Sequence, residues 1–136
     1  MRALRQHRDG VVGGRRAGAP PPINAVGLSI LGPALILYGS EEQKRRFLPK
    51  ILTADEIWCQ GFSEPGAGSD LQSIRTTALK SGNGYVLNGS KTFITNGQHA
   101  NLIIVVAKTD PTQGAKGTSL MVVETEQTPG FRRGRK

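Results

Sequence analysis

Residues 62–70, with the sequence FSEPGAGSD, most strongly constrain what this chain can fold into. Strand-like runs precede this segment at 57–62 and follow it at 74–79, so the backbone has to turn sharply between them. Pro65 fixes one φ angle, and the glycines after it permit φ values that other residues resist. The sequence therefore predicts a rigid turn of small side chains between two strands.

The same turn carries groups that can bind a ligand. Successive N–H groups in a tight turn can form a concavity for an anion, and Ser63 and Ser69 add hydroxyl groups that can donate hydrogen bonds. A ligand can approach closely because the side chains are small. The residues alone indicate a site for an anionic or heteroaromatic ligand, although a surface turn without function is the commoner interpretation of an isolated glycine-rich loop.

Composition limits the class of protein. The 136 residues suit one domain or part of a larger protein, and the hydrophobic content of 37% supports a modest core. The longest apolar stretch, 25–37, is interrupted by glycine and proline, so no membrane span is expected. The arginines near the start are not followed by an apolar stretch, so no secretory signal is predicted. A single cysteine, Cys59, excludes an internal disulfide framework and fits a reducing compartment.

The net charge of +8 first suggests a partner such as nucleic acid, but its distribution argues against one. The excess lies in residues 1–16 and 132–136, whereas residues 17–131 hold nine basic and nine acidic side chains. A nucleic-acid-binding domain is expected to carry its basic patch on the fold itself. We therefore expect no nucleic-acid partner.

The two basic ends are predicted to lie outside the folded part. Residues 1–16 form a basic head without an apolar period and are predicted to be disordered. They are compatible with a presequence, an unusual start site or an out-of-frame segment. Residues 132–136 form a basic tail.

Two helices are predicted before the turn. Residues 23–38 show apolar spacing of three and four with almost no charge, which predicts a mostly buried helix with a kink at Pro33 and a cap at Gly39. Ser40, followed three residues later by Gln43, predicts a capping box at the start of a second helix. The apolar stripe of this second helix is expected to be Phe47, Leu48, Ile51 and Leu52.

The period becomes strand-like from residue 57 onward. The predicted strands end at glycine- and asparagine-rich turns and cover 57–62, 74–80, 85–87, 91–95, 102–107 and 118–124. The run 102–107 is continuously apolar and is expected to be buried on both faces. The fold class is therefore predicted as α+β, with helices followed by an antiparallel β-sheet or β-barrel.

Several single residues have structural interpretations. Cys59 is predicted to be a small core residue, Trp58 a packing anchor and Asp70 a cap of a turn. His99 has no second histidine or carboxylate at a spacing suited to a metal, so no metal site is predicted.

Three motifs in order resemble the acyl-CoA dehydrogenase family. The turn FSEPGAGSD at 62–70 resembles that family's [ST]-E-P-G-A-G-S-D signature, and YVLNGSKTFITNG at 85–97 resembles its Y-x-L-N-G-x-K-x-[WF]-I-T-N-G segment. Upstream, GSEEQKRRFLP at 39–49 resembles its G-x-E-E-Q-K-x-x-[FY]-L-P helix start, and AKTD at 107–110 also fits. They occur in the family's order, and the resemblance extends over residues 17–131, which is most of the chain.

The resemblance implies a domain organisation. Residues 17–56 would be the end of the N-terminal helical domain, and 57–131 most of the middle β-domain that binds flavin and acyl-CoA. The family's C-terminal helical bundle, which supplies the catalytic glutamate, has no counterpart here. The sequence is therefore interpreted as a truncated or frame-shifted family member, or a gene fragment, with no catalytic residue in this chain.

The resemblance also implies the residues that bind the cofactor, FAD. Ser63 would bind the pyrimidine edge of the flavin, Thr95 would bind near flavin N5, and Phe93, often tryptophan in the family, would cover part of the ring. Ser69 would contact the acyl-CoA. The complete implied cofactor set is Gln60, Gly61, Phe62, Ser63, Gly68, Ser69, Phe93, Ile94 and Thr95.

The implied activity is α,β-dehydrogenation of an acyl-CoA thioester with hydride transfer to flavin N5. Without the glutamate, the isolated chain is expected to be inactive. The alternatives are a non-catalytic fragment or, within the superfamily, an acyl-CoA oxidase, an enoyl-CoA reductase or a flavin monooxygenase. The implied electron acceptor is electron-transfer flavoprotein, the full-length family forms homo- or hetero-oligomers, and the expected location is the bacterial cytoplasm or the mitochondrial matrix.

Overall fold

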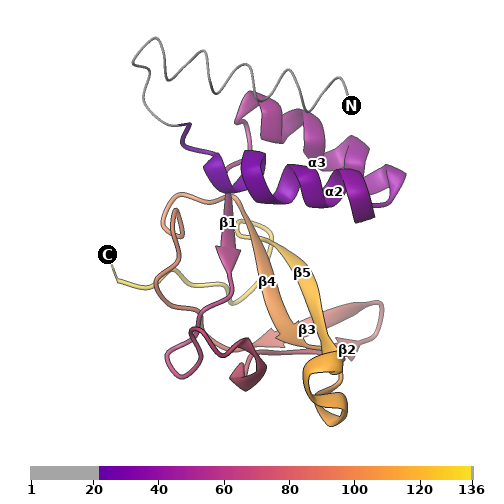
Figure 1. Ribbon diagram of the computed structural model, residues 1–136, viewed down its shortest axis with the longest axis vertical. Helices are drawn as coiled ribbons and strands as arrows, with labels where there is room; N and C mark the ends of the chain where they lie inside the picture. The colour runs from indigo at the N-terminus through magenta and orange to yellow at the C-terminus, as the bar shows by residue number, and fades with distance from the viewer. Residues whose placement is uncertain (1–21, 136) are drawn as a thin grey trace.

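The computed structural model describes residues 22–135, and Figure 1 shows a layer of helices above a β-sheet. The α+β class predicted from the sequence is confirmed. The predictions for residues 1–16 lie outside the described residues. Within those residues, no helix is both long and apolar enough to cross a membrane.

Proline decides the geometry of the first helical segment. It contains a π-helical part, Gly27–Leu31 (η1), followed by α2, Gly32–Tyr38. Pro33 lies at the start of α2, and it has no N–H group for the hydrogen bond of a continuous α-helix. Instead, the Gly32 N–H group bonds to the Gly27 carbonyl, five residues earlier. The kink predicted at Pro33 therefore takes the form of a π-helical turn.

The expectation that most faces of this segment are buried is wrong. Leu31 is buried, but Ile30, Ile36, Leu37 and Tyr38 are exposed. The segment packs against the second helix and the start of the sheet on one side only, so its other apolar side chains remain exposed. Gly39 does end α2, but its backbone is extended rather than left-handed, and a Cβ atom there would lie 2.6 Å from the Leu35 carbonyl oxygen.

The second helix, α3, spans Glu41–Thr53 and starts as predicted. The Ser40 hydroxyl accepts a hydrogen bond from the Gln43 N–H group, and the Gln43 side chain accepts one from the Ser40 N–H group, which completes the capping box. Phe47 and Ile51 are buried. Leu52, which was predicted in the apolar stripe, is 70% exposed because it lies beside the face that packs.

The sheet is mixed and open rather than an antiparallel sheet or a closed barrel. It consists of β1, Trp58–Gly61; β2, Thr77–Ser81; β3, Gly84–Asn88; β4, Leu102–Lys108; and β5, Thr118–Glu124. β4 is central: β5 runs antiparallel along its whole length, while β1 runs parallel to its first half. β2 meets only the end of β4, in parallel, and pairs with β3 as the predicted hairpin. Two 3₁₀ segments, Leu71–Ser73 (η2) and Pro111–Gly117 (η3), lie in the connections.

One predicted strand, 91–95, is absent, and this prediction is wrong. Phe93 and Asn96 have φ angles of 55° and 63°, in the left-handed region that interrupts a strand. The Thr92 N–H group bonds to the Ser63 carbonyl at 2.9 Å, so this segment pairs with the turn after β1. It is therefore a loop that lies beside the FSEPGAGSD turn.

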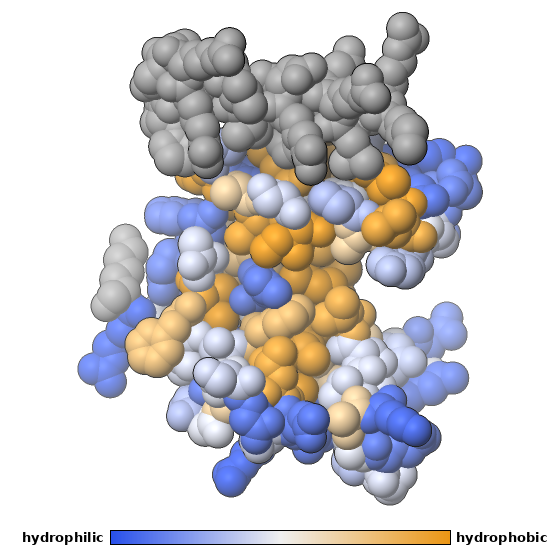
Figure 2. Space-filling model, viewed as in Figure 1, coloured by the Kyte–Doolittle hydropathy of each residue, from blue (hydrophilic) through white to orange (hydrophobic). Residues whose placement is uncertain are grey.

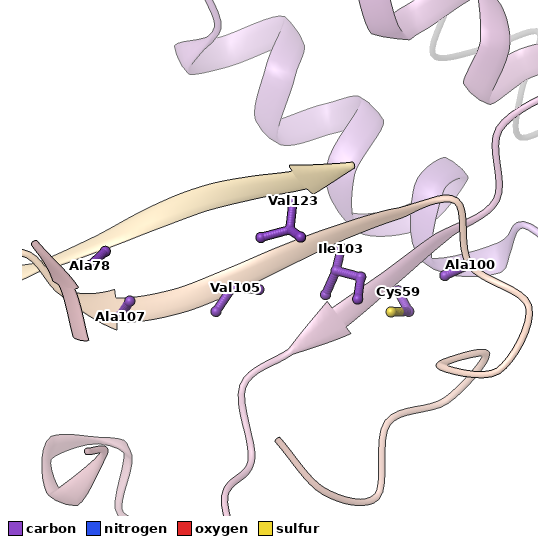
Figure 3. Packing of buried hydrophobic residues seen from close by; sticks show 7 residues of the cluster. All are labelled: Cys59, Ala78, Ala100, Ile103, Val105, Ala107 and Val123. Atoms are coloured by element: carbon purple, nitrogen blue, oxygen red, sulfur yellow. The ribbon is translucent and has the colours of Figure 1, made fainter. Parts of the chain in front are cut away.

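The two faces of β4 form two hydrophobic clusters, as its continuous apolar run predicted. Trp58, Leu102 and Ile104 pack with Leu31, Phe47 and Ile51 of the helical layer. Figure 3 shows the second cluster, in which Ile103, Val105 and Ala107 of β4 lie among residues of β1, β2 and β5. In Figure 2, apolar surface extends from the helices over the middle of the sheet, with polar residues at its margins.

Candidate functional site

The turn after β1 is closed by its own backbone. The Glu64 N–H group donates to the Ala67 carbonyl at 2.8 Å, and the Ala67 N–H group donates back at 3.1 Å. The expected unusual φ values at Gly66 and Gly68 do not occur, because neither glycine lies in the left-handed region. A Cβ atom at either position would meet nothing within 4 Å. These glycines therefore leave open space beside the backbone.

Glu64 anchors this turn from inside. Its carboxylate accepts hydrogen bonds from the N–H groups of Arg75 at 2.7 Å and Thr76 at 3.0 Å. It also forms a buried ion pair with Lys91, whose Nζ atom lies 2.7 Å from Oε1. Burial alone would raise the pKa of Glu64, but the hydrogen bonds, above all that from Lys91, lower it to about 2. Glu64 is therefore held ionised, with its carboxylate hydrogen-bonded to Lys91 and to two backbone N–H groups.

This pKa gives a testable pH dependence. Because the folded pKa of Glu64 lies below the ordinary value of 4.5, the carboxylate stabilises the fold at neutral pH. This contribution falls as the pH drops from about 4.5 towards about 2. We expect Glu64→Gln to lower the free energy of unfolding at pH 7, and the difference from wild type to shrink at pH 3. Urea unfolding at both pH values measures this, with the exposed Glu126→Gln as control. A difference that does not change with pH would contradict the assignment.

A pocket of about 480 Å³ opens beside this turn. Its walls come from four parts of the chain: the first helical segment, the end of β1 with the turn, the start of η2, and the loop after β3. Seven of the predicted cofactor residues line it: Gln60, Phe62, Ser63, Gly68, Phe93, Ile94 and Thr95. Phe93 is 99% exposed at the rim, and its left-handed backbone is a strained conformation for a bulky residue. The tertiary structure thus brings together residues that lie more than thirty positions apart in the sequence.

Two predicted residues do not line this pocket. Gly61 is a buried residue of β1, where a Cβ atom would lie only 3.0 Å from the Ile103 side chain, so packing explains this glycine. Ser69 is exposed next to the pocket-lining Gly68. Conversely, Val26, Ile30 and Leu71 line the pocket and were not predicted. Apolar periodicity could not identify Val26 and Ile30, because it does not show which turn of a helix faces a site.

The structural interpretations of three residues agree with the structure. Asp70 caps η2, accepting from the Gln72 N–H group at 3.0 Å, and its hydrogen bond from Ser73 lowers its pKa. Trp58 is fully buried, with its ring edge-on to Phe47 at 5.2 Å. Cys59 is buried in the core, and this burial raises its pKa to about 11, which disfavours the reactive thiolate. In the described part of the chain, no group of three histidine, cysteine or acidic residues could hold a metal.

The fold and the pocket define a class: an α+β protein whose open mixed sheet presents a small-residue turn and a hydroxyl-bearing pocket. Comparison with known proteins agrees with this description. Residues 59–136 match the middle domain of acyl-CoA dehydrogenases. The chain therefore belongs to the acyl-CoA dehydrogenase family.

Individual relatives show how far the similarity extends. Over 116 residues the chain is 45% identical to acyl-CoA dehydrogenase IpdE1 of Mycobacterium tuberculosis, covering 85% of this chain and 30% of that protein. The structure superposes on an acyl-CoA dehydrogenase from Geobacillus kaustophilus with a TM-score of 0.77 and 53% identity, over 82% of this chain and 30% of the other. A structure of PigA with FAD and proline matches with a TM-score of 0.71 and 38% identity, over 76% of this chain and 27% of the other. The chain thus spans about 30% of the length of IpdE1 and of the Geobacillus kaustophilus protein.

Proposed function

We propose that this chain forms the flavin-ring site of an acyl-CoA dehydrogenase. The observation that carries the proposal is the pocket of about 480 Å³, where seven of the residues that the family resemblance assigns to the cofactor come together. The PigA structure with bound FAD, which the chain resembles, supports the same cofactor.

The pocket fits the ring of FAD in size and chemistry. Its volume lies within the range of about 300–1,000 Å³ that is usual for cofactor sites. Its walls are largely apolar, from Val26, Ile30, Phe62 and Leu71, with few polar groups to fix an orientation. The space beside Gly68 allows a flat ligand to approach the backbone.

Four residues at or beside the pocket have proposed roles in binding the cofactor and the substrate. When bound, FAD would supply the hydride acceptor for α,β-dehydrogenation of an acyl-CoA thioester. Ser63 and Thr95 would donate hydrogen bonds to the ring from two sides of the pocket, and Phe93 would cover the ring and exclude water. Ser69, exposed beside the pocket, would contact the acyl-CoA.

A base for removal of the α-proton is not found at this pocket. None of the described residues that line it carries a carboxylate, and Glu64 is occupied by Lys91 and two backbone N–H groups. We therefore expect the 136 residues by themselves to bind flavin without oxidising acyl-CoA, the base being supplied by another part of a complete enzyme. For that enzyme we propose electron-transfer flavoprotein as acceptor, assembly as an oligomer, and a cytoplasmic or mitochondrial matrix location.

Titration with FAD tests the proposed function. We expect the chain to quench the fluorescence of added FAD, and Ser63→Ala and Thr95→Ala each to weaken binding about 2- to 10-fold, because each removes one hydrogen bond worth about 0.5–1.5 kcal/mol. Ser81→Ala, in an exposed strand end away from the pocket, is the control. Anaerobic addition of an acyl-CoA is expected to leave the flavin absorbance unchanged. The absence of FAD binding by the folded chain would reject the proposal.

A further inference from the structure

A buried ion pair connects two sides of the pocket. Glu64 directly follows Ser63 in the turn after β1, and Lys91 lies two residues before Phe93 in the loop after β3. The Glu64 and Lys91 side chains are only 6% and 12% exposed, with Nζ and Oε1 2.7 Å apart. Lys91 Nζ also donates to the Phe62 carbonyl at 3.0 Å. The pair therefore lies just outside the pocket and joins two of the segments that form its walls.

Further hydrogen bonds surround this pair. The carboxylate holds the backbone of Arg75 and Thr76 at the approach to β2. Next to Lys91, the Thr92 N–H group donates to the Ser63 carbonyl at 2.9 Å. A buried ion pair is expensive unless its remaining hydrogen-bonding capacity is satisfied, and here several further bonds satisfy it.

The connected loop holds an unfavourable backbone conformation. Phe93 has a φ angle of 55°, which a bulky residue adopts only where its surroundings enforce it. Before Phe93, the hydrogen bonds from Lys91 and Thr92 hold the loop against the turn after β1. After Phe93, the Gly97 N–H group bonds to the Ile94 carbonyl at 3.0 Å, and Asn96 Nδ2 donates to the Ile23 carbonyl at 2.6 Å. The segment that carries Phe93 and Thr95 is thus held at both ends.

We propose that Glu64 and Lys91 are positioning residues, which set the spacing between Ser63 on one side of the pocket and Phe93 to Thr95 on another. Neither side chain lines this pocket, so both act through the backbone that they hold. The inference rests on the proposed function, because the ligand whose binding depends on this spacing is the flavin ring.

The test compares FAD binding by variants of the ion pair. Lys91→Met keeps the length of the side chain but removes its charge and hydrogen bonds, and we expect it to weaken FAD binding at least 10-fold and to shift the visible absorption bands of the bound flavin. Lys91→Arg, which can bind both the carboxylate and the Phe62 carbonyl, is expected to recover most of the affinity. The matched control is Lys44→Met, in an exposed ion pair with Glu41 on α3. Fluorescence of the single, buried Trp58 verifies that each variant is folded.

Hydrogen exchange tests the inference without flavin. In Lys91→Met the Thr92 amide, which donates to Ser63, should exchange at least 10-fold faster, while the Ile104 amide in β4 should not change. If Lys91→Met does not fold, the double variant Glu64→Gln/Lys91→Met leaves no unpaired buried charge and serves in its place. Wild-type chain that binds no FAD would reject the proposed function. A folded variant that binds FAD within twofold of wild type, or whose Thr92 exchange is unchanged, would reject the positioning role.

Discussion

Replacing Trp58 by alanine is expected to lower the free energy of unfolding by about 3–5 kcal/mol, the usual cost of removing a buried tryptophan. Trp58 is fully buried, and it lies where β1 meets the helical layer. Its ring packs edge-on to Phe47 at 5.2 Å and contacts the cluster formed by Leu102 and Ile104 of β4. Removal of the ring would leave a cavity that can close only if the helices and the sheet move relative to each other. We therefore expect the loss in free energy of unfolding to lie in the upper part of the range of about 3–5 kcal/mol.

Urea unfolding followed by far-UV circular dichroism measures this change, since the variant has no tryptophan left to report. Tyr38→Ala is the matched control, because this aromatic side chain at the end of α2 is 87% exposed and its removal should change stability by less than about 0.5 kcal/mol. A loss of less than about 1 kcal/mol for Trp58→Ala would show that the helical layer does not depend on this contact.

Replacing Asn24 by leucine is expected to cost at least about 2 kcal/mol, because each buried polar group left without a partner costs about 1–3 kcal/mol. The Asn24 side chain is completely buried. Its Nδ2 group donates to the carbonyls of Ile51 and Glu56, each at 3.1 Å, and its Oδ1 atom accepts from the Trp58 N–H group at 3.0 Å. One amide thus joins the first helical segment, the end of α3 and the start of β1.

The appropriate control for this change is Gln127→Leu, which alters an exposed amide and should be nearly neutral. Urea unfolding of both variants gives the comparison. Equal stabilities for the two variants would show that the three backbone groups find other partners, and that Asn24 does not hold the layers together.

Local chemistry explains why some elements could be predicted. The capping box of Ser40 and Gln43 and the turn cap at Asp70 involve residues at most three positions apart, so spacing alone indicates them. The continuous apolar run of β4 predicted burial on both faces, and the two clusters confirm it. Family motifs likewise predicted which residues of the turn and of the loop at 93–95 come together at one pocket.

Other features depended on partners that are distant in the sequence. The segment 91–95 alternates like a strand, but Lys91 finds Glu64, 27 positions earlier, and the segment becomes a loop. β1 pairs in parallel with the first half of β4, and β2 pairs with the end of β4, so the turn after β1 lies between these two pairings. No local pattern in the sequence specifies this strand order. Leu52 has the chemistry of a core residue, but its place on α3 leaves it exposed.

The sequence by itself determined the α+β class, the start of α3, the positions of most strands and the family. Short-range hydrogen bonding, apolar periodicity and motif spacing all depend on residues that are close in the sequence, so they can be recognised without the structure. Only the tertiary structure decided the mixed sheet, the left-handed backbone at Phe93 and the contribution of Val26 and Ile30 to the pocket. The physical reason is that these features depend on contacts between distant residues. A buried charge such as Glu64 needs a partner of opposite charge, and the segment that carries this partner adopts a loop instead of the strand that its local sequence favours.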